Sequence, residues 1–168
     1  TAGQTELSFG KTAAGGGSYP KCLIWNAQNR VKGVFHDRDS TDSWTYATVA
    51  WRQMNASTAT NNRFDFISGD ASAALIARHS VLGGAPPGRG ESAFGLDAVN
   101  AVAAGSSISQ SNVGGLTTYN PIYDDMPGLG YHYLAPIEYN STTSNMTWYG
   151  DLGDPTVYKC GFNVIWEY

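Results

Sequence analysis

The sequence predicts an all-β fold, an antiparallel β-sandwich or jelly roll. Charged residues make up only 14% of the 168-residue chain, and no run is rich in the Leu, Glu, Lys and Ala that favour helices. Gly (20), Tyr (10) and Trp (5) are abundant, and aromatic residues favour strands. Roughly eight or nine strand-like stretches recur at fairly regular spacing, which is typical of sandwiches and jelly rolls.

The strongest strand signal covers residues 43–55, SWTYATVAWRQMN. Alternation places Trp44 and Tyr46 on one face of an extended backbone, and Val49 and Trp51 on the other. Because both faces carry large groups, we expect a central strand between two layers, or a strand with one face turned to another subunit. We also expect at least one of the two tryptophans to be almost fully buried.

Two regions precede this strand. Residues 1–20 form an N-terminal arm, because residues 1–18 have few large apolar groups and Gly15–Gly17 separates them from the rest. Such a segment is expected to be weakly ordered in free solution. Residues 21–168 form the sandwich domain, and its first strands are expected at residues 22–26 and 31–35.

Residues 72–81 are ambiguous, because their alanines would suit a helix. The neighbouring strands and Gly83–Gly84 favour a strand, with Leu75, Ala77, His79 and Val81 on one side. Residues 157–168 alternate as well, with Tyr158, Cys160, Phe162, Val164 and Trp166 facing inward. The second pattern indicates that the C-terminal strand belongs to the sheet. Further strands are expected at residues 63–68, 92–97, 131–139 and 145–149, with at most one weak strand in residues 99–120. Pro136 indicates an edge position or a bulge in its strand.

The chain has two cysteines, Cys22 and Cys160, in strand-like runs near opposite ends. A disulfide can form if the first and last strands pair. We favour the alternative, in which both are buried small apolar side chains.

Composition argues against several functions. The net charge is −4 and no Lys/Arg cluster is present, so we expect no nucleic-acid partner. No apolar run approaches about 18 residues, so we expect no membrane insertion. His36, His79 and His132 have no paired spacing, and no Ser nucleophile elbow occurs. We therefore predict that the protein is not an enzyme and has no catalytic residue.

Three acidic residues, Asp37, Asp39 and Asp42, lie close together in the sequence. Their spacing misses the calcium-loop pattern, which needs a Gly at the sixth position and a Glu at the twelfth. We interpret them as turn caps. The sequence thus predicts neither a metal site nor a cofactor.

The candidate binding residues are aromatic residues that we expect in exposed loops, together with neighbouring acidic residues. They are Tyr119, Tyr123, Asp124, Asp125 and Trp148. Such groups bind sugars by stacking and hydrogen bonding, and they also form protein interfaces. We favour the interface.

Five segments give the chain a family resemblance. They are WNAQNRV (25–31), TDSWTYATVAWRQMNAS (41–57), FGLDAVNA (94–101), PGLGYHYLAPIEY (127–139) and TWYGDLGDPTV (147–157). In this order they resemble structural proteins of tailed bacteriophages and prophages, of the tail-fibre-like or capsid-decoration kind. The resemblance covers Cys22 to Tyr168. It implies a β-rich virion protein that trimerises and has no catalytic motif to transfer.

These observations lead to an expected function. The leading expectation is a homotrimeric cement protein on the virion surface, which bridges capsomers and binds the major capsid protein. The first alternative is the receptor-binding head of a tail fibre, with a host-surface glycan as its ligand. The alternative from another class is a secreted carbohydrate-binding module, which the aromatic residues and the Asn-X-Ser/Thr patterns at Asn55, Asn140 and Asn145 would suit.

Overall fold

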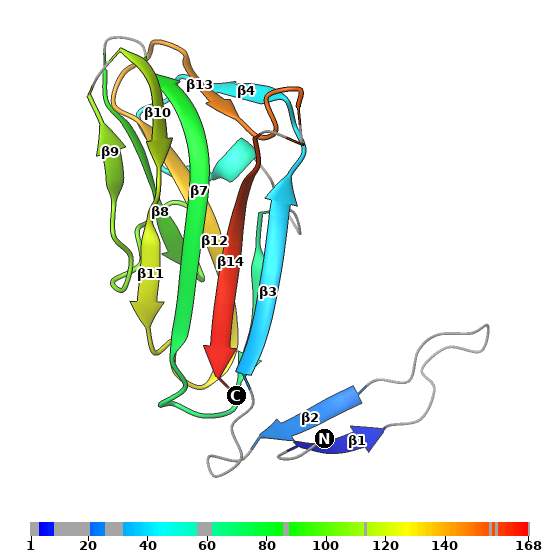
Figure 1. The fold of residues 1–168 in the computed structure, drawn as a ribbon. Coiled ribbons are helices and arrows are strands. Elements are labelled where there is room, and N and C mark those ends of the chain that lie inside the picture. Colours follow the sequence, from blue (N-terminus) through cyan, green and yellow to red (C-terminus); the bar gives the residue numbers. More distant parts are fainter. Residues whose placement is uncertain are drawn as a thin grey trace, which may run out of the picture.

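The computed structural model describes residues 4–8, 21–25, 32–56, 62–85, 88–112, 114–154, 156 and 158–167. Within these residues the fold is all-β, as predicted: every strand pair is antiparallel, and the one helical element is the short 3₁₀ turn η1 (Met54–Ala56). Figure 1 shows two curled sheets that face each other. No helix in the described part of the chain is long and apolar enough to cross a membrane.

The first large sheet is organised around the long strand β7 (Leu75–Ala85). One edge of β7 pairs with β14 along residues 75–80 and with β13 along residues 82–84, while the other edge pairs with β11 and β10. The strand β3 pairs with β14, and β4 pairs with β13. The bounds of these strands are β3 Lys32–Asp39, β4 Ser43–Tyr46, β10 Gly115–Tyr119, β11 Ile122–Asp125, β13 Met146–Tyr149 and β14 Cys160–Glu167.

The second large sheet has β12 (Gly130–Asn140) at its centre. On one side β12 pairs with β8, which in turn pairs with β9, and on the other side it pairs with β6 and then β5. The bounds are β5 Arg52–Gln53, β6 Phe64–Ser68, β8 Gly90–Leu96 and β9 Ser109–Ser111. The region 99–120 thus contains two strands, β9 and β10, where the sequence indicated at most one.

β12 is not an edge strand, because it is paired on both sides over most of its length, but Pro136 lies where one side is locally unpaired, which fits the predicted edge position. Pro136 lies opposite Phe94 of β8. The Phe94 N–H donates to Ser106 Oγ, so it points away from β12, and the two residues form a non-hydrogen-bonded pair. The Pro136 nitrogen therefore points to the other side, where pairing with β6 ends at Leu134 and pairing with β5 begins at Ile137. No ladder hydrogen bond is lost there.

The core lies between the two sheets. Leu75, Phe162 and Val164 of the first sheet pack against Phe94 and Leu134 of the second. The predicted inward faces of β7 and β14 are confirmed, since Leu75, Ala77, His79 and Val81 are buried, as are Cys160, Phe162, Val164 and Trp166. Cys160 is a buried free thiol, as we favoured.

Residues 43–55 do not form one central strand, and this prediction is wrong. β4 lies at the edge of the first sheet, and the chain then crosses to the second sheet, where β5 pairs with β12. The crossing segment is held by two hydrogen bonds: Tyr46 Oη donates to the Ala50 carbonyl oxygen, and the Ala50 N–H donates to the Thr48 carbonyl oxygen. Small side chains at Ala47 and Ala50 give this segment little apolar surface to bury.

The expected burial of Trp44 or Trp51 is also wrong, because both tryptophans are only half-buried. Trp44 lies on an edge strand, and Trp51 precedes a strand of two residues. The fully buried tryptophan is Trp148, directly opposite Trp44 on β13. β13 pairs on both sides, with β4 and β7, which explains the difference.

The N-terminal part forms a separate hairpin. β1 (Gln4–Ser8) pairs with β2 (Lys21–Trp25), and Figure 1 shows this hairpin outside the sandwich. The strand expected at residues 22–26 therefore exists as far as Trp25, but it pairs with the predicted arm and not with the sandwich. The remaining residues of the predicted arm (1–3 and 9–20) lie outside the described residues.

Candidate functional site

The expectation that Tyr119, Tyr123 and Trp148 are exposed loop residues is wrong. All three are fully buried, on β10, β11 and β13, and their side chains face the core because their strands pair with β7. Burial, with a smaller contribution from Asp125, raises the pKa of Tyr123 to about 12. Asp124 and Asp125 are exposed, so these two are the predicted binding residues that a partner can reach.

A more strongly polar region lies where β3 ends. A cavity of about 270 Å³, which we call the polar cavity, opens between the end of β3, η1 and Asn62, which lies two residues before β6. Its lining residues are Asp37, Arg38, Asp39, Ser40, Thr41, Asn55 and Asn62. Three separate segments of the chain therefore build it.

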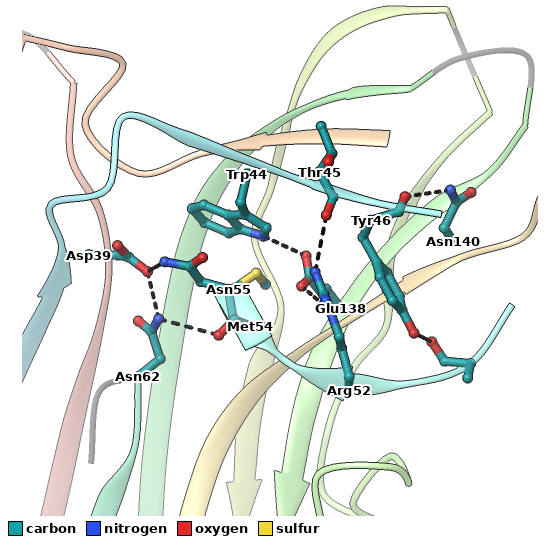
Figure 2. Close-up of polar contacts among 11 residues, drawn as sticks. Asp39, Trp44, Thr45, Tyr46, Arg52, Met54, Asn55, Asn62, Glu138 and Asn140 are labelled. Carbon is teal, nitrogen blue, oxygen red and sulfur yellow. Dashed lines mark hydrogen bonds and ion pairs between the residues drawn. The ribbon is translucent and has the colours of Figure 1, made fainter. Parts of the chain in front are cut away.

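Asp39 lies at the centre of the hydrogen bonds in the polar cavity (Figure 2). Its Oδ2 accepts hydrogen bonds from the side-chain nitrogens of Asn62 (2.7 Å) and Asn55 (2.9 Å). Its Oδ1 accepts from the Thr41 N–H at 2.9 Å. Burial opposes ionisation, but these hydrogen bonds outweigh it and hold the pKa of Asp39 below its ordinary value. The Asp39 carboxylate is therefore ionised at neutral pH.

Asp37 lies two residues earlier on the same face of β3. Its Oδ2 accepts a hydrogen bond from the Asn62 N–H at 2.9 Å, and its Oδ1 accepts from the Arg38 N–H at 2.8 Å. The bond from Thr41 to Asp39 is the turn capping that we predicted. The long-range hydrogen bonds from Asn55 to Asp39, and from Asn62 to Asp37 and Asp39, could not be predicted from the sequence pattern.

The backbone around the polar cavity is strained. Asn55 (φ 57°), Ala56 (φ 48°) and Asn62 (φ 51°) adopt the left-handed conformation. Asn tolerates this region because its side chain can hydrogen-bond locally, but for Ala it is unfavourable. The bonds from the two Asn side chains to Asp39 stabilise this arrangement.

Next to the polar cavity, a buried glutamate joins the two sheets. Glu138 of β12 is 0% exposed, and it accepts hydrogen bonds from Arg52 Nε (2.7 Å) and Trp44 Nε1 (2.9 Å), as Figure 2 shows. The Arg52 guanidinium also lies 3.8 Å from the centre of the Tyr46 ring. Burial raises the pKa of Glu138 to about 7, although Arg52, Trp44 and the Asn55 backbone favour its charged form. Asn55 thus touches both Glu138 and Asp39.

A buried Cys–His pair lies on the inner face of the first sheet. Cys160 Sγ is 3.5 Å from His79 Nε2, a geometry that also occurs in nucleophilic catalysis. Here burial raises the pKa of the Cys160 thiol and lowers the pKa of His79 to about 3. Both groups are therefore neutral at pH 7, and the thiolate that such catalysis needs is not formed.

The histidines lie far apart on the sandwich, on β3, β7 and β12. His132 Nδ1 is 2.7 Å from Asp97 Oδ2, and the exposed His36 contacts Asn163. In the described ranges no group of three or more His, Cys, Asp or Glu residues is arranged to hold a metal ion.

Comparison with known proteins identifies no family for the chain. No family model matches it, and no curated protein matches it either. Functional reasoning therefore depends on the geometry and on the sequence resemblance. Sequence reasoning missed four residues of this geometry, Asn55, Asn62, Arg52 and Glu138. Only Glu138 could have been recognised from the sequence, as a charged residue inside an apolar strand.

Proposed function

We propose that this protein is a non-enzymatic surface protein of a tailed-bacteriophage virion, a homotrimer that decorates the capsid and bridges its capsomers. The observation that carries the proposal is the β1–β2 hairpin outside the sandwich. An isolated two-stranded hairpin is at best marginally stable in water. A hairpin at this position is suited to pair with a neighbouring protein surface, here the major capsid protein.

The strand order supports a jelly roll, an architecture found in viral capsid proteins. In the sandwich the first strand pairs with the last, β3 with β14, and the next pairs inward are β4 with β13 and then β5 and β6 with β12. Further inward, β7 pairs with β10 and β11, and β8 pairs with β9. A chain that is folded as a long hairpin and then wrapped into two sheets has this nested pairing.

The outer face of the first sheet supports self-assembly. Val34 (59% exposed), Ile165 and Ile76 lie opposite one another on β3, β14 and β7, and we call these three residues the apolar row. Ile122 (44% exposed) lies on β11 opposite Arg78, outside the row. An antiparallel sheet with one solvated face normally carries polar residues there. Exposed apolar patches mark interaction sites.

The charges around the apolar row favour a second copy of the chain as the occupant. Lys32, Arg38 and Arg78 are exposed on the same outer face. The chain as a whole has a net charge of −4, so the remaining surface of a second copy is acidic on balance. A basic face on an acidic chain suits head-to-tail packing around a three-fold axis.

Two measurements test the proposal. Light scattering should report a trimer for the wild type and a monomer for Val34→Asp, whereas Ile67→Asp, an equally exposed position on the second sheet, should stay trimeric. Deletion of residues 1–10, which removes β1, should leave the trimer folded and abolish co-sedimentation with capsids that lack this protein. A stable wild-type monomer at micromolar concentration, or capsid binding by the truncated trimer, would refute the respective part.

The second candidate is a receptor-binding head, because Asp124 and Asp125 remain exposed. The double variant Asp124→Asn, Asp125→Asn should keep capsid binding if the cement function is right. If this variant instead loses attachment to host cells, while the truncated protein keeps it, the receptor-binding function replaces the cement function.

A further inference from the structure

The polar cavity contains a buried hydrogen-bond acceptor that has no partner among the described residues, Asn62 Oδ1. Asn62 is only 2% exposed. Its amide nitrogen donates to Asp39 Oδ2 at 2.7 Å and to the Met54 carbonyl oxygen at 3.5 Å. These bonds fix the amide orientation, and Figure 2 shows the oxygen on the side away from Met54. A buried unpaired acceptor is unfavourable by about 1–3 kcal/mol.

The neighbouring carboxylate of Asp37 also has unused acceptor capacity. An ionised carboxylate offers roughly four lone-pair sites. Asp37 accepts from Asn62 and Arg38, and Asp39 accepts from Asn55, from Asn62 and from both the N–H and the hydroxyl of Thr41. By this count about two sites remain on Asp37 and two on Asn62 Oδ1, whereas those of Asp39 are filled.

The donors that line the polar cavity do not fill these sites. The Asn55 amide nitrogen is already shared between Asp39 and Thr41 Oγ1. Arg38 also lines the polar cavity, but among the described residues its guanidinium makes no hydrogen bond or ion pair with Asp37, Asp39 or Asn62. What these acceptors lack is a bound positive group.

We propose that the polar cavity binds a hard divalent cation of the Ca²⁺ type, with Asp37 and Asn62 as its protein ligands and the neighbouring Asp39 carboxylate as an additional negative charge. Ca²⁺ takes six to eight oxygen ligands, including Asp carboxylates and Asn carbonyls, in a flexible geometry that water molecules complete. A volume of about 270 Å³ leaves room for those waters.

This site is independent of the capsid-decoration function. The cation binds the folded chain, because only folding brings Asp37 and Asp39 next to Asn62. By mass action it raises the free energy of unfolding as its concentration exceeds the dissociation constant. Its structural effect is to hold the left-handed Asn62 and the end of β3 in place.

The first test is Ca²⁺ binding to the chelator-treated full chain, measured by titration calorimetry and by the melting temperature. We expect saturable binding in the range of extracellular Ca²⁺ modules, roughly 0.1–1 mM, and a rise in melting temperature. Asp37→Asn keeps the side-chain shape but removes a charge, and it should weaken Ca²⁺ binding about tenfold or more, because affinity follows ligand charge. Asp42→Asn is the matched control, since Asp42 is a nearby exposed acidic residue that does not line the polar cavity, and it should bind like the wild type.

A second variant separates a cation site from a network that only stabilises the fold. Asn62→Asp places a third carboxylate beside Asp39, and Asp tolerates the left-handed backbone. The variant should melt at a lower temperature than the wild type in chelator and show a larger rise with Ca²⁺. If Asn62→Asp lowers the melting temperature equally with chelator and with Ca²⁺, the proposal is overturned. It is also overturned if Asp37→Asn and Asp42→Asn weaken Ca²⁺ binding equally. The same holds if the melting temperature of the wild type does not shift at roughly 10 mM Ca²⁺, tenfold above the weakest known dissociation constants.

Discussion

Replacement of Glu138 by Gln should change how the stability of the protein depends on pH. The folded-state pKa of Glu138 is about 7, against an ordinary value of 4.5. Between these pH values the folded chain keeps a proton that the unfolded chain has released, so stability falls as the pH rises through this window. The difference corresponds to about 3 kcal/mol of unfolding free energy between pH 4.5 and pH 8.

The Gln side chain resembles the protonated carboxyl, so Glu138→Gln should remove this slope. Arg52 stays protonated throughout, but its ion pair with Glu138 forms only as the carboxyl ionises. The effect of Arg52 is therefore already contained in the folded-state pKa of about 7 and adds no separate dependence on pH. Relative to the wild type, the variant should gain up to about 3 kcal/mol as the pH rises from 4.5 to 8.

The assay is urea unfolding at a series of pH values, followed by tryptophan fluorescence. The informative quantity is the difference in unfolding free energy between variant and wild type, because other groups that titrate in both proteins cancel in it. Asp124→Asn, which removes an exposed carboxylate, controls for the change in net charge. A difference that stays flat between pH 4.5 and 8 would show that Glu138 is ionised throughout, and the reasoning from burial would fail.

Three further predictions concern the core, and urea unfolding measures each of them. Gly83→Ala should destabilise the fold by about 1–3 kcal/mol, because its new Cβ would lie 2.7 Å from Met146 Cε. Gly84→Ala, where the nearest atom is 3.5 Å from the new Cβ, should lose little stability, and equal losses of stability in the two variants would contradict this. Burial lowers the pKa of His79 to about 3, so the free energy of unfolding should fall as the pH drops from 6.5 toward 3, and His79→Gln should reduce that fall. If the variant lost stability with falling pH as steeply as the wild type, His79 would not be the cause. Trp148→Ala should cost about 3–5 kcal/mol, since the side chain is fully buried; a loss below about 1 kcal/mol would contradict its central position.

The sequence predicts those strands best that bury one face along their whole length. β7 and β14 pair with each other, and their alternation gave the inward residues correctly, from Leu75 to Val81 and from Cys160 to Trp166. The prediction failed for Tyr119 and Tyr123, because β10 and β11 are only five and four residues long. Their burial is decided by β7, about 40 residues earlier in the chain, and no local pattern encodes that pairing.

The polar cavity was beyond sequence reasoning for a related reason. Asp39, Asn55 and Asn62 are ordinary turn residues by type, and local turn chemistry explains each of them. What joins them is a set of side-chain hydrogen bonds across 16 and 23 residues of sequence. Only the folded chain shows that the Asn62 amide nitrogen donates to Asp39 and Met54 and that its amide oxygen has no hydrogen-bond partner among the described residues.

The broken strand at residues 43–55 and the buried Glu138 are one feature of the fold. In a continuous strand Trp44 and Arg52 would lie about 26 Å apart, since a strand rises about 3.3 Å per residue. They could not then donate to the same carboxylate. Because the chain leaves the first sheet after Tyr46 and enters the second at Arg52, Trp44 reaches Glu138 from the facing sheet and Arg52 reaches it from the neighbouring strand. The buried charge is therefore compatible only with the broken strand, and it disfavours the continuous strand that the alternation of residues 43–55 predicts.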